Sequence, residues 1–87
     1  MPGRYTVQIK RSALKGLQGL PGHRQAQLRK QIDSLAENPR PSGVIKLAGE
    51  ENLYRVRVGD YRIIYQIQDK ALLVLVVKIG HRREVYR

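Results

Sequence analysis

Three strand-like segments in the second half of the chain constrain the fold most strongly. Apolar and polar residues alternate over residues 53–58 and again over 61–67, and a glycine–aspartate pair separates the two segments. A two-residue turn with glycine first is typical of a tight β-hairpin. The third segment, 71–79, is apolar at nearly every position, as expected for a central strand that is covered on both faces. The second half therefore predicts three consecutive strands.

The first half predicts one strand and two helices. Residues 5–10 alternate as a strand does, and residues 12–20 carry leucines at helical spacing behind Ser12, a candidate N-cap. A proline–glycine pair separates them from a second helix over 22–36, a proline-rich loop follows, and 44–47 is a candidate short strand. The order β-α-α-β-β-β predicts an α+β fold: an N-terminal strand, a helical hairpin and a three- to four-stranded, mainly antiparallel sheet. We expect the helices on one sheet face and the other face open.

Length and composition narrow the function. The 87 residues fit a single domain, 1–87, and the chain has no cysteine and two isolated histidines. We therefore expect no metal site and no cofactor. The longest apolar run is 7 residues and no basic–apolar leader opens the sequence, so we expect neither a membrane span nor a signal peptide, and a cytoplasmic location.

Charge is the strongest compositional signal. Lysine and arginine number 17 against 7 acidic residues, which gives a formal net charge of +10. Most of the basic residues are arginines, whose planar guanidinium suits phosphate. An imbalance of this size favours a polyanionic or acidic partner: nucleic acid, an anionic membrane surface or an acidic protein.

Arginines line one face of the predicted hairpin. If Gly59 and Asp60 form the turn, Arg57 opposes Arg62 and Arg55 opposes an isoleucine. Like charges that face each other across a strand pair repel, unless an anion lies between them. The pattern favours an anion-binding face over an ordinary solvated one.

The C-terminal segment adds further candidates. His81, Arg82, Arg83 and Tyr86 follow the predicted central strand, so they can fold back beside the hairpin. Taken singly, His81 fits an ordinary exposed histidine, and Tyr86 a partly buried tyrosine at a strand end, better than a functional role.

The sequence resembles a known family over essentially its whole length. The run LYRVRVGDYRIIYQI, the apolar strand after it and GHRREVY resemble the RelE family of bacterial toxins, within the RelE/ParE superfamily. The N-terminal strand, the helical hairpin that ends in NPRP, and the KLAG segment are similar too. The resemblance implies a ribosome-dependent mRNA endonuclease that cuts the codon in the A site of the small subunit and thereby inhibits translation. It also implies a cognate antitoxin as partner.

The resemblance implies roles for particular residues. Arg62 would hold the scissile phosphate and stabilise its developing negative charge, and Arg82 would stabilise the leaving oxygen. Tyr86 corresponds to the family's terminal tyrosine. Arg55 and Arg57 correspond to the family's residues that position the RNA backbone, and we expect additional RNA contacts from Lys78 and Arg83.

One departure from the family concerns proton transfer. The best-known members carry lysines where this chain has Arg55 and Arg57, and an arginine cannot give up its proton near neutral pH. Proton transfer would then fall to Tyr86 or, more speculatively, to His81, because histidine titrates nearest to neutral pH.

Three alternatives remain open at the level of sequence. The first is a ParE-like toxin of the same fold, which inhibits DNA gyrase by binding. The second is a basic RNA-binding module without catalysis, and the third is a toxin that has lost its activity.

Overall fold

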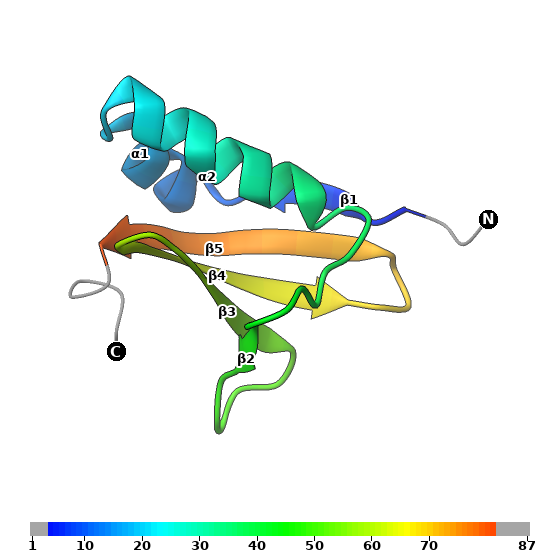
Figure 1. Ribbon diagram of the computed structural model, residues 1–87. Coiled ribbons are helices and arrows are strands. Elements are labelled where there is room, and N and C mark those ends of the chain that lie inside the picture. The colour runs from blue at the N-terminus through cyan, green and yellow to red at the C-terminus, as the bar shows by residue number, and fades with distance from the viewer. Residues whose placement is uncertain (1–3, 82–87) are drawn as a thin grey trace.

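One five-stranded sheet carries two helices on one of its faces (Figure 1). The computed structural model describes residues 4–81. The elements, in chain order, are β1 (Thr6–Ile9), α1 (Arg11–Gln18), α2 (Gly22–Ser34), β2 (Ile45–Lys46), β3 (Leu53–Val58), β4 (Tyr61–Gln68) and β5 (Leu73–His81). The predicted α+β class and the order of its elements are confirmed.

The sheet is mixed, with strand order β1-β5-β4-β3-β2. Neighbouring strands are antiparallel except at one edge, where β1 runs parallel to β5. The sequence predicted the N-terminal strand but not its partner. Its pairing with β5 makes that long apolar strand an internal one, as its composition predicted.

The β3–β4 hairpin forms in the predicted register. Val58 lies opposite Tyr61 and Arg57 opposite Arg62, so Gly59 and Asp60 form the two-residue turn. Gly59 has a φ of 60°, a left-handed conformation that glycine adopts without steric cost. The turn thereby fixes which side chains face the helices and which face away.

A β-bulge interrupts the β4–β5 pair. Ile64 pairs with Lys78 and the next residue, Tyr65, pairs with Val76, so Val77 is an extra residue on β5. A bulge changes the side to which the following side chains point. Val76 and Ile79 are consequently both buried, although three positions separate them.

The core lies between the helices and the sheet. Its fully buried members from the helices and the loop after them are Leu17, Leu28 and Leu35, and those from the sheet are Ile63, Tyr65, Ile67, Val74 and Val76. α1 packs directly on β5, and α2 lies against β3. The approach of α1 is close because Gly16 faces the sheet: a Cβ at this position would lie 2.8 Å from the carbonyl oxygen of Ile79.

Two predicted details were wrong. Ser12 does not cap α1, because the helix begins at Arg11, with Lys10 as the N-cap residue. Lys10 donates its N–H to Val76 at 2.8 Å and accepts that of Leu14 at 2.9 Å, so the chain passes from sheet pairing into helix at this residue. In addition, α2 ends at Ser34 rather than at residue 36.

The outer face of the sheet, the face away from the helices, is open only in part. The loop of residues 47–51 lies on this side (Figure 1). Ile64 belongs to the outer face by its register opposite Arg55, yet it is only 9% exposed. Leu47 and Ala48 of the loop lie beside it, lining the same hollow.

Candidate phosphate-binding face

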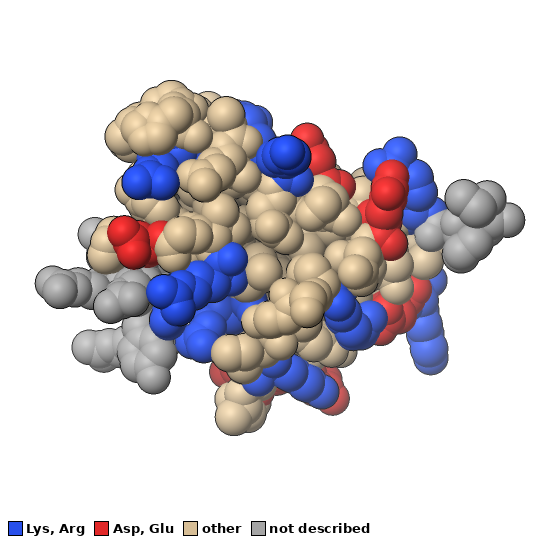
Figure 2. Space-filling view, in the orientation of Figure 1, with Lys and Arg blue, Asp and Glu red and all other residues tan. Residues whose placement is uncertain are grey.

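Arg57, Arg62 and Gly80 form one row across three strands on the outer face. Arg57 pairs with Arg62, and Arg62 pairs in turn with Gly80 on β5. Gly80 contributes no side chain to this row. Figure 2 shows basic side chains gathered over the end of β3 that leads into the hairpin turn. The row therefore places two cations opposite each other on β3 and β4.

The two arginines of this row are held differently. Arg57 is exposed, and its Nε donates to the carbonyl oxygen of Gly59 at 3.2 Å. Arg62 is half-buried, and its Nε and NH1 atoms are buried. A guanidinium that is partly removed from water interacts more strongly with an anion than an exposed one does. Arg62 is therefore the stronger candidate for direct phosphate contact.

A second row lies two residues further along the strands. Arg55 pairs with Ile64, and Ile64 pairs with Lys78. Residues two apart in a strand are separated by about 6.8 Å, so the two rows lie that far apart. The structure thus brings together four of the predicted site residues, Arg55, Arg57, Arg62 and Lys78, on one face.

His81 lies at the end of the same sheet but in a different row. It pairs with Tyr61, which in turn pairs with Val58, the row that alternates with Arg57 and Arg62. The rings of Tyr61 and His81 meet edge to face at 5.7 Å. The backbone register therefore directs His81 to the helix-covered side of the sheet rather than into the arginine row. The other predicted residues, Arg82, Arg83 and Tyr86, lie outside the described residues.

No metal centre accompanies this face in the part of the chain that the structure describes. Within residues 4–81, no three histidine or acidic side chains are grouped so that they could hold a metal ion. Over the same residues, neither helix is long and apolar enough to cross a membrane.

A polar cluster at the opposite end of β4 was missed by sequence reasoning. Arg40, from the loop after α2, donates to both carboxylate oxygens of Asp69, at 3.2 and 2.9 Å. Tyr5 donates to the same carboxylate at 2.6 Å. The Arg40 guanidinium also lies 5.2 Å from the ring centre of Tyr54 and donates to its hydroxyl at 3.4 Å. The cluster ties the N-terminus and the loop after α2 to the β4–β5 turn.

The cluster shifts the pKa values of its members. Hydrogen bonds from Arg40 and then from Tyr5 lower the pKa of Asp69 to about 2. The Asp69 carboxylate in turn raises the pKa of Arg40 and that of Tyr5. These shifts describe a fixed ion pair. It joins the loop after α2 to the β4–β5 turn, which indicates a structural role.

The fold and the arginine rows define a class: small α+β domains that cover one sheet face with helices and present a cationic face to an anionic partner. Comparison with known proteins narrows this class to one family. The family model described as the ParE toxin of the type II toxin–antitoxin system, parDE, matches residues 7–86. The mRNA interferase toxin RelE of Escherichia coli strain K12 is 31% identical over 86 residues, which cover 94% of this chain and 90% of the relative.

Solved structures agree with this. The archaeal RelE–RelB complex from Pyrococcus horikoshii OT3 contains a chain with a TM-score of 0.81 and 36% identity, with 91% of this chain and 96% of that chain covered. The intact E. coli RelBE toxin–antitoxin complex gives a TM-score of 0.78 at 29% identity, with 88% and 95% covered. This chain belongs to the RelE/ParE toxins of type II toxin–antitoxin systems. The resemblance noted from sequence is confirmed.

Proposed function

We propose that this toxin is a ribosome-dependent endoribonuclease that cleaves the mRNA codon in the A site of the small subunit and so inhibits translation. The observation that carries the proposal is the pairing of Arg57 with Arg62 beside Gly80, which puts two cations suited to phosphate on one face of the sheet. It is supported by the similarity to a toxin named as an mRNA interferase.

The reaction is an attack of the RNA 2′-oxygen on the adjacent phosphorus. The new P–O2′ bond forms as the P–O5′ bond breaks, leaving a 2′,3′-cyclic phosphate and a 5′-hydroxyl. One group must accept the 2′-proton and another must protonate the leaving oxygen. Negative charge grows on the phosphate oxygens in the transition state, and preorganised cations lower that barrier.

The residue roles follow from this chemistry. Arg62 holds the scissile phosphate and stabilises its charge, and Arg82 neutralises the leaving oxygen. The RNA backbone is positioned by Arg55 and Arg57, with Lys78 and Arg83 as outer contacts. Proton transfer falls to Tyr86, with His81 as the second candidate; His81 would have to reach the phosphate around the end of the sheet.

The proposed partner in the resting state is a cognate antitoxin that covers the cationic face. The P. horikoshii and E. coli relatives were each solved in complex with an antitoxin. A partner that binds only the folded toxin also stabilises it by mass action.

Expression of the wild-type chain and of Arg62→Ala, with mapping of mRNA 5′ ends, tests the proposal. We expect growth arrest and codon-phased cuts within translated frames for the wild type. For Arg62→Ala we expect cleavage to fall by about 100-fold or more, the usual cost of removing one transition-state donor. Arg29→Ala is the matched control, because Arg29 is exposed on α2, on the far side of the sheet.

A second function is tested in the same cells, because the matching family model is named for ParE toxins. A gyrase inhibitor changes the supercoiling of plasmid DNA and leaves mRNA intact. Altered supercoiling without mRNA cuts would replace the nuclease proposal. RNA binding without cuts would instead indicate a non-catalytic module.

A further inference from the structure

A hollow on the outer face lies directly beside the arginine rows. It has a volume of about 480 Å³ and is lined by Leu47, Ala48, Glu50, Leu53 and Ile64. This volume lies within the range of about 300–1,000 Å³ for small-molecule sites. The lining residues are apolar except for Glu50. We call this space the Ile64 hollow.

The loop that forms the hollow is held in place at both of its ends. The N–H of Leu47 donates to the carbonyl oxygen of Leu53 at 2.9 Å, and the N–H of Ile67 donates to that of Asn52 at 2.9 Å. Between these anchors, Gly49 turns the chain with a φ of 79°. Glu50 therefore sits on a short loop tied to both strands of the hairpin.

The floor of the hollow is flanked by cations. Ile64 lies between Arg55 and Lys78 in its row, and the Arg57–Arg62 row is about 6.8 Å away along the strands. That separation is about the length of one nucleotide in an extended RNA strand. An RNA whose phosphate contacts Arg57 and Arg62 thus brings a neighbouring nucleotide over Ile64.

We propose that the Ile64 hollow is a nucleobase subsite in which Glu50 selects bases that carry an amino group. The proposal rests on the proposed function and adds a source of base preference to it. A base has apolar faces, which suit Leu47 and Ile64, and polar edges, which need a partner. The Glu50 carboxylate only accepts hydrogen bonds. Adenine, cytosine and guanine each offer it an amino donor, whereas uracil has no amino group and offers only its N3–H, which is flanked by two carbonyl oxygens that repel a carboxylate.

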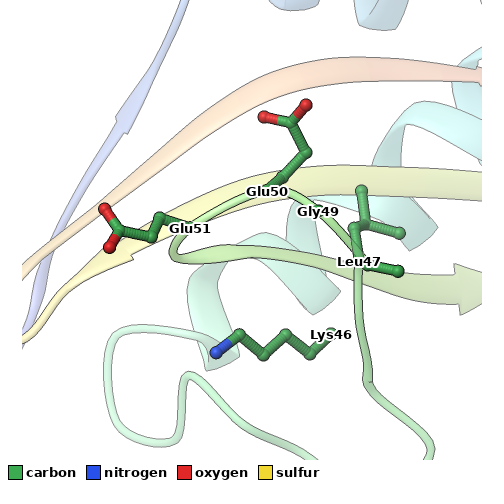
Figure 3. A pocket seen from close by; sticks show the side chains of 6 residues that line it. Lys46, Leu47, Gly49, Glu50 and Glu51 are labelled. Carbon is green, nitrogen blue, oxygen red and sulfur yellow. The ribbon is translucent and has the colours of Figure 1, made fainter.

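Glu51 provides a matched control within the same loop. Figure 3 shows that the side chains of Glu50 and Glu51 point in different directions from the loop. Glu51 is also not among the residues that line the Ile64 hollow. Glu50→Gln and Glu51→Gln remove the same charge from adjacent positions, but only the first changes a residue that lines the hollow.

The cleavage test uses purified toxin and ribosomes programmed with mRNAs that differ in one A-site base at a time. At one codon position, we expect the wild type to disfavour uracil by about 5- to 100-fold, the discrimination that one base-edge contact provides. Glu50→Gln should reduce this ratio toward one, because an amide both donates and accepts, and Glu51→Gln should leave it unchanged. An unchanged uracil ratio in Glu50→Gln would overturn the proposal while leaving the nuclease function intact.

A binding test separates this inference from catalysis. The probe is a short single-stranded RNA with 2′-deoxyribose at the cleavage position, so that it cannot react. We expect the methyl NMR signals of Leu47 and Ile64 to shift with an adenine-containing probe, and to shift less with its uracil counterpart. Equal shifts with both probes, or no shift with either, would overturn the subsite. So would shifts caused by an antitoxin peptide alone, which would assign the hollow to protein binding.

Discussion

Arg57 and Arg62 lie directly opposite each other across the β3–β4 pair, on the sheet face that carries no helix. Like charges at paired positions destabilise a sheet. We expect this arrangement to cost stability and a bound phosphate to relieve the repulsion. We therefore expect the two side chains that form the proposed phosphate site to lower the stability of the free toxin.

Removing one of these charges should stabilise the protein. For Arg57→Gln we expect the free energy of unfolding at low ionic strength to rise by about 0.2–1 kcal/mol, the usual size of a cross-strand charge effect. Inorganic phosphate should then stabilise the wild type more than the variant. Urea unfolding followed by circular dichroism measures both effects. Lys70→Gln in the exposed β4–β5 turn is the control, since it removes one positive charge outside the rows. If both variants gained the same stability, the effect would reflect net charge alone.

Gly16 should be the least replaceable glycine of the helices. Alanine usually stabilises a helix relative to glycine by about 0.5–1 kcal/mol. At Gly16 its Cβ would meet the backbone carbonyl oxygen of Ile79 at 2.8 Å, so α1 must move away from β5. We expect Gly16→Ala to lower the free energy of unfolding by about 1–3 kcal/mol, as overpacking does.

The control for this substitution is Gly22→Ala at the start of α2. A Cβ at Gly22 meets nothing within 4 Å, so this variant should be neutral or slightly more stable than the wild type. Thermal unfolding of the two variants compares them directly. A Gly16→Ala protein as stable as Gly22→Ala would show that α1 packs less closely than described.

The hairpin and the arginine rows were predictable because local signals determine them. The Gly59–Asp60 turn fixes the register, and with it the faces of Arg57 and Arg62. The pairing of Arg40 with Asp69 carried no such signal, since the two residues lie 29 positions apart in irregular segments. Only the assembled sheet and the loop after α2 bring them together.

The outer face was predicted less well for a related reason. Alternation places Ile64 on that face but does not say that the loop of residues 47–51 lies over it. The β-bulge at Val77 was likewise invisible, because an uninterrupted apolar run contains no alternation to break. The Ile64 hollow depends on the loop, so it could not be predicted from the sequence.

The protonation of the buried Tyr65 should make the free energy of unfolding depend on pH in the alkaline range. Its ring is fully buried, its hydroxyl donates to the carbonyl oxygen of Pro39 at 2.7 Å, and burial raises its pKa to about 12. The pKa of Tyr65 in the folded state lies above its ordinary value of 10.0. The stabilisation by its protonated hydroxyl is therefore complete below about pH 10 and is lost as the pH rises toward 12. Tyr65→Phe should reduce the free energy of unfolding near neutral pH by about 1–3 kcal/mol, since it leaves a buried carbonyl without its donor.

Urea unfolding at a series of pH values tests this role of Tyr65. The loss of stability between about pH 10 and 12 should be shallower in Tyr65→Phe than in the wild type. Tyr61→Phe, at the other end of β4, keeps the Tyr65 hydrogen bond and should retain the wild-type slope. Equal slopes for Tyr65→Phe and the wild type would contradict the assignment.

Asp69 should contribute to the loss of stability at acid pH. Its pKa of about 2 lies below its ordinary value of 3.8, chiefly because Arg40 and then Tyr5 donate hydrogen bonds to its carboxylate. A depressed folded-state pKa means that the stabilisation is present above about pH 4 and is lost as the pH falls toward 2. We expect Asp69→Asn to be less stable than the wild type near neutral pH, and the difference to shrink across this window. Urea unfolding between neutral pH and pH 2 measures it, with Asp33→Asn on the exposed face of α2 as the control. A stability difference that stayed constant down to pH 2 would mean that Asp69 acts through packing or the neutral hydrogen bonds rather than through its charge.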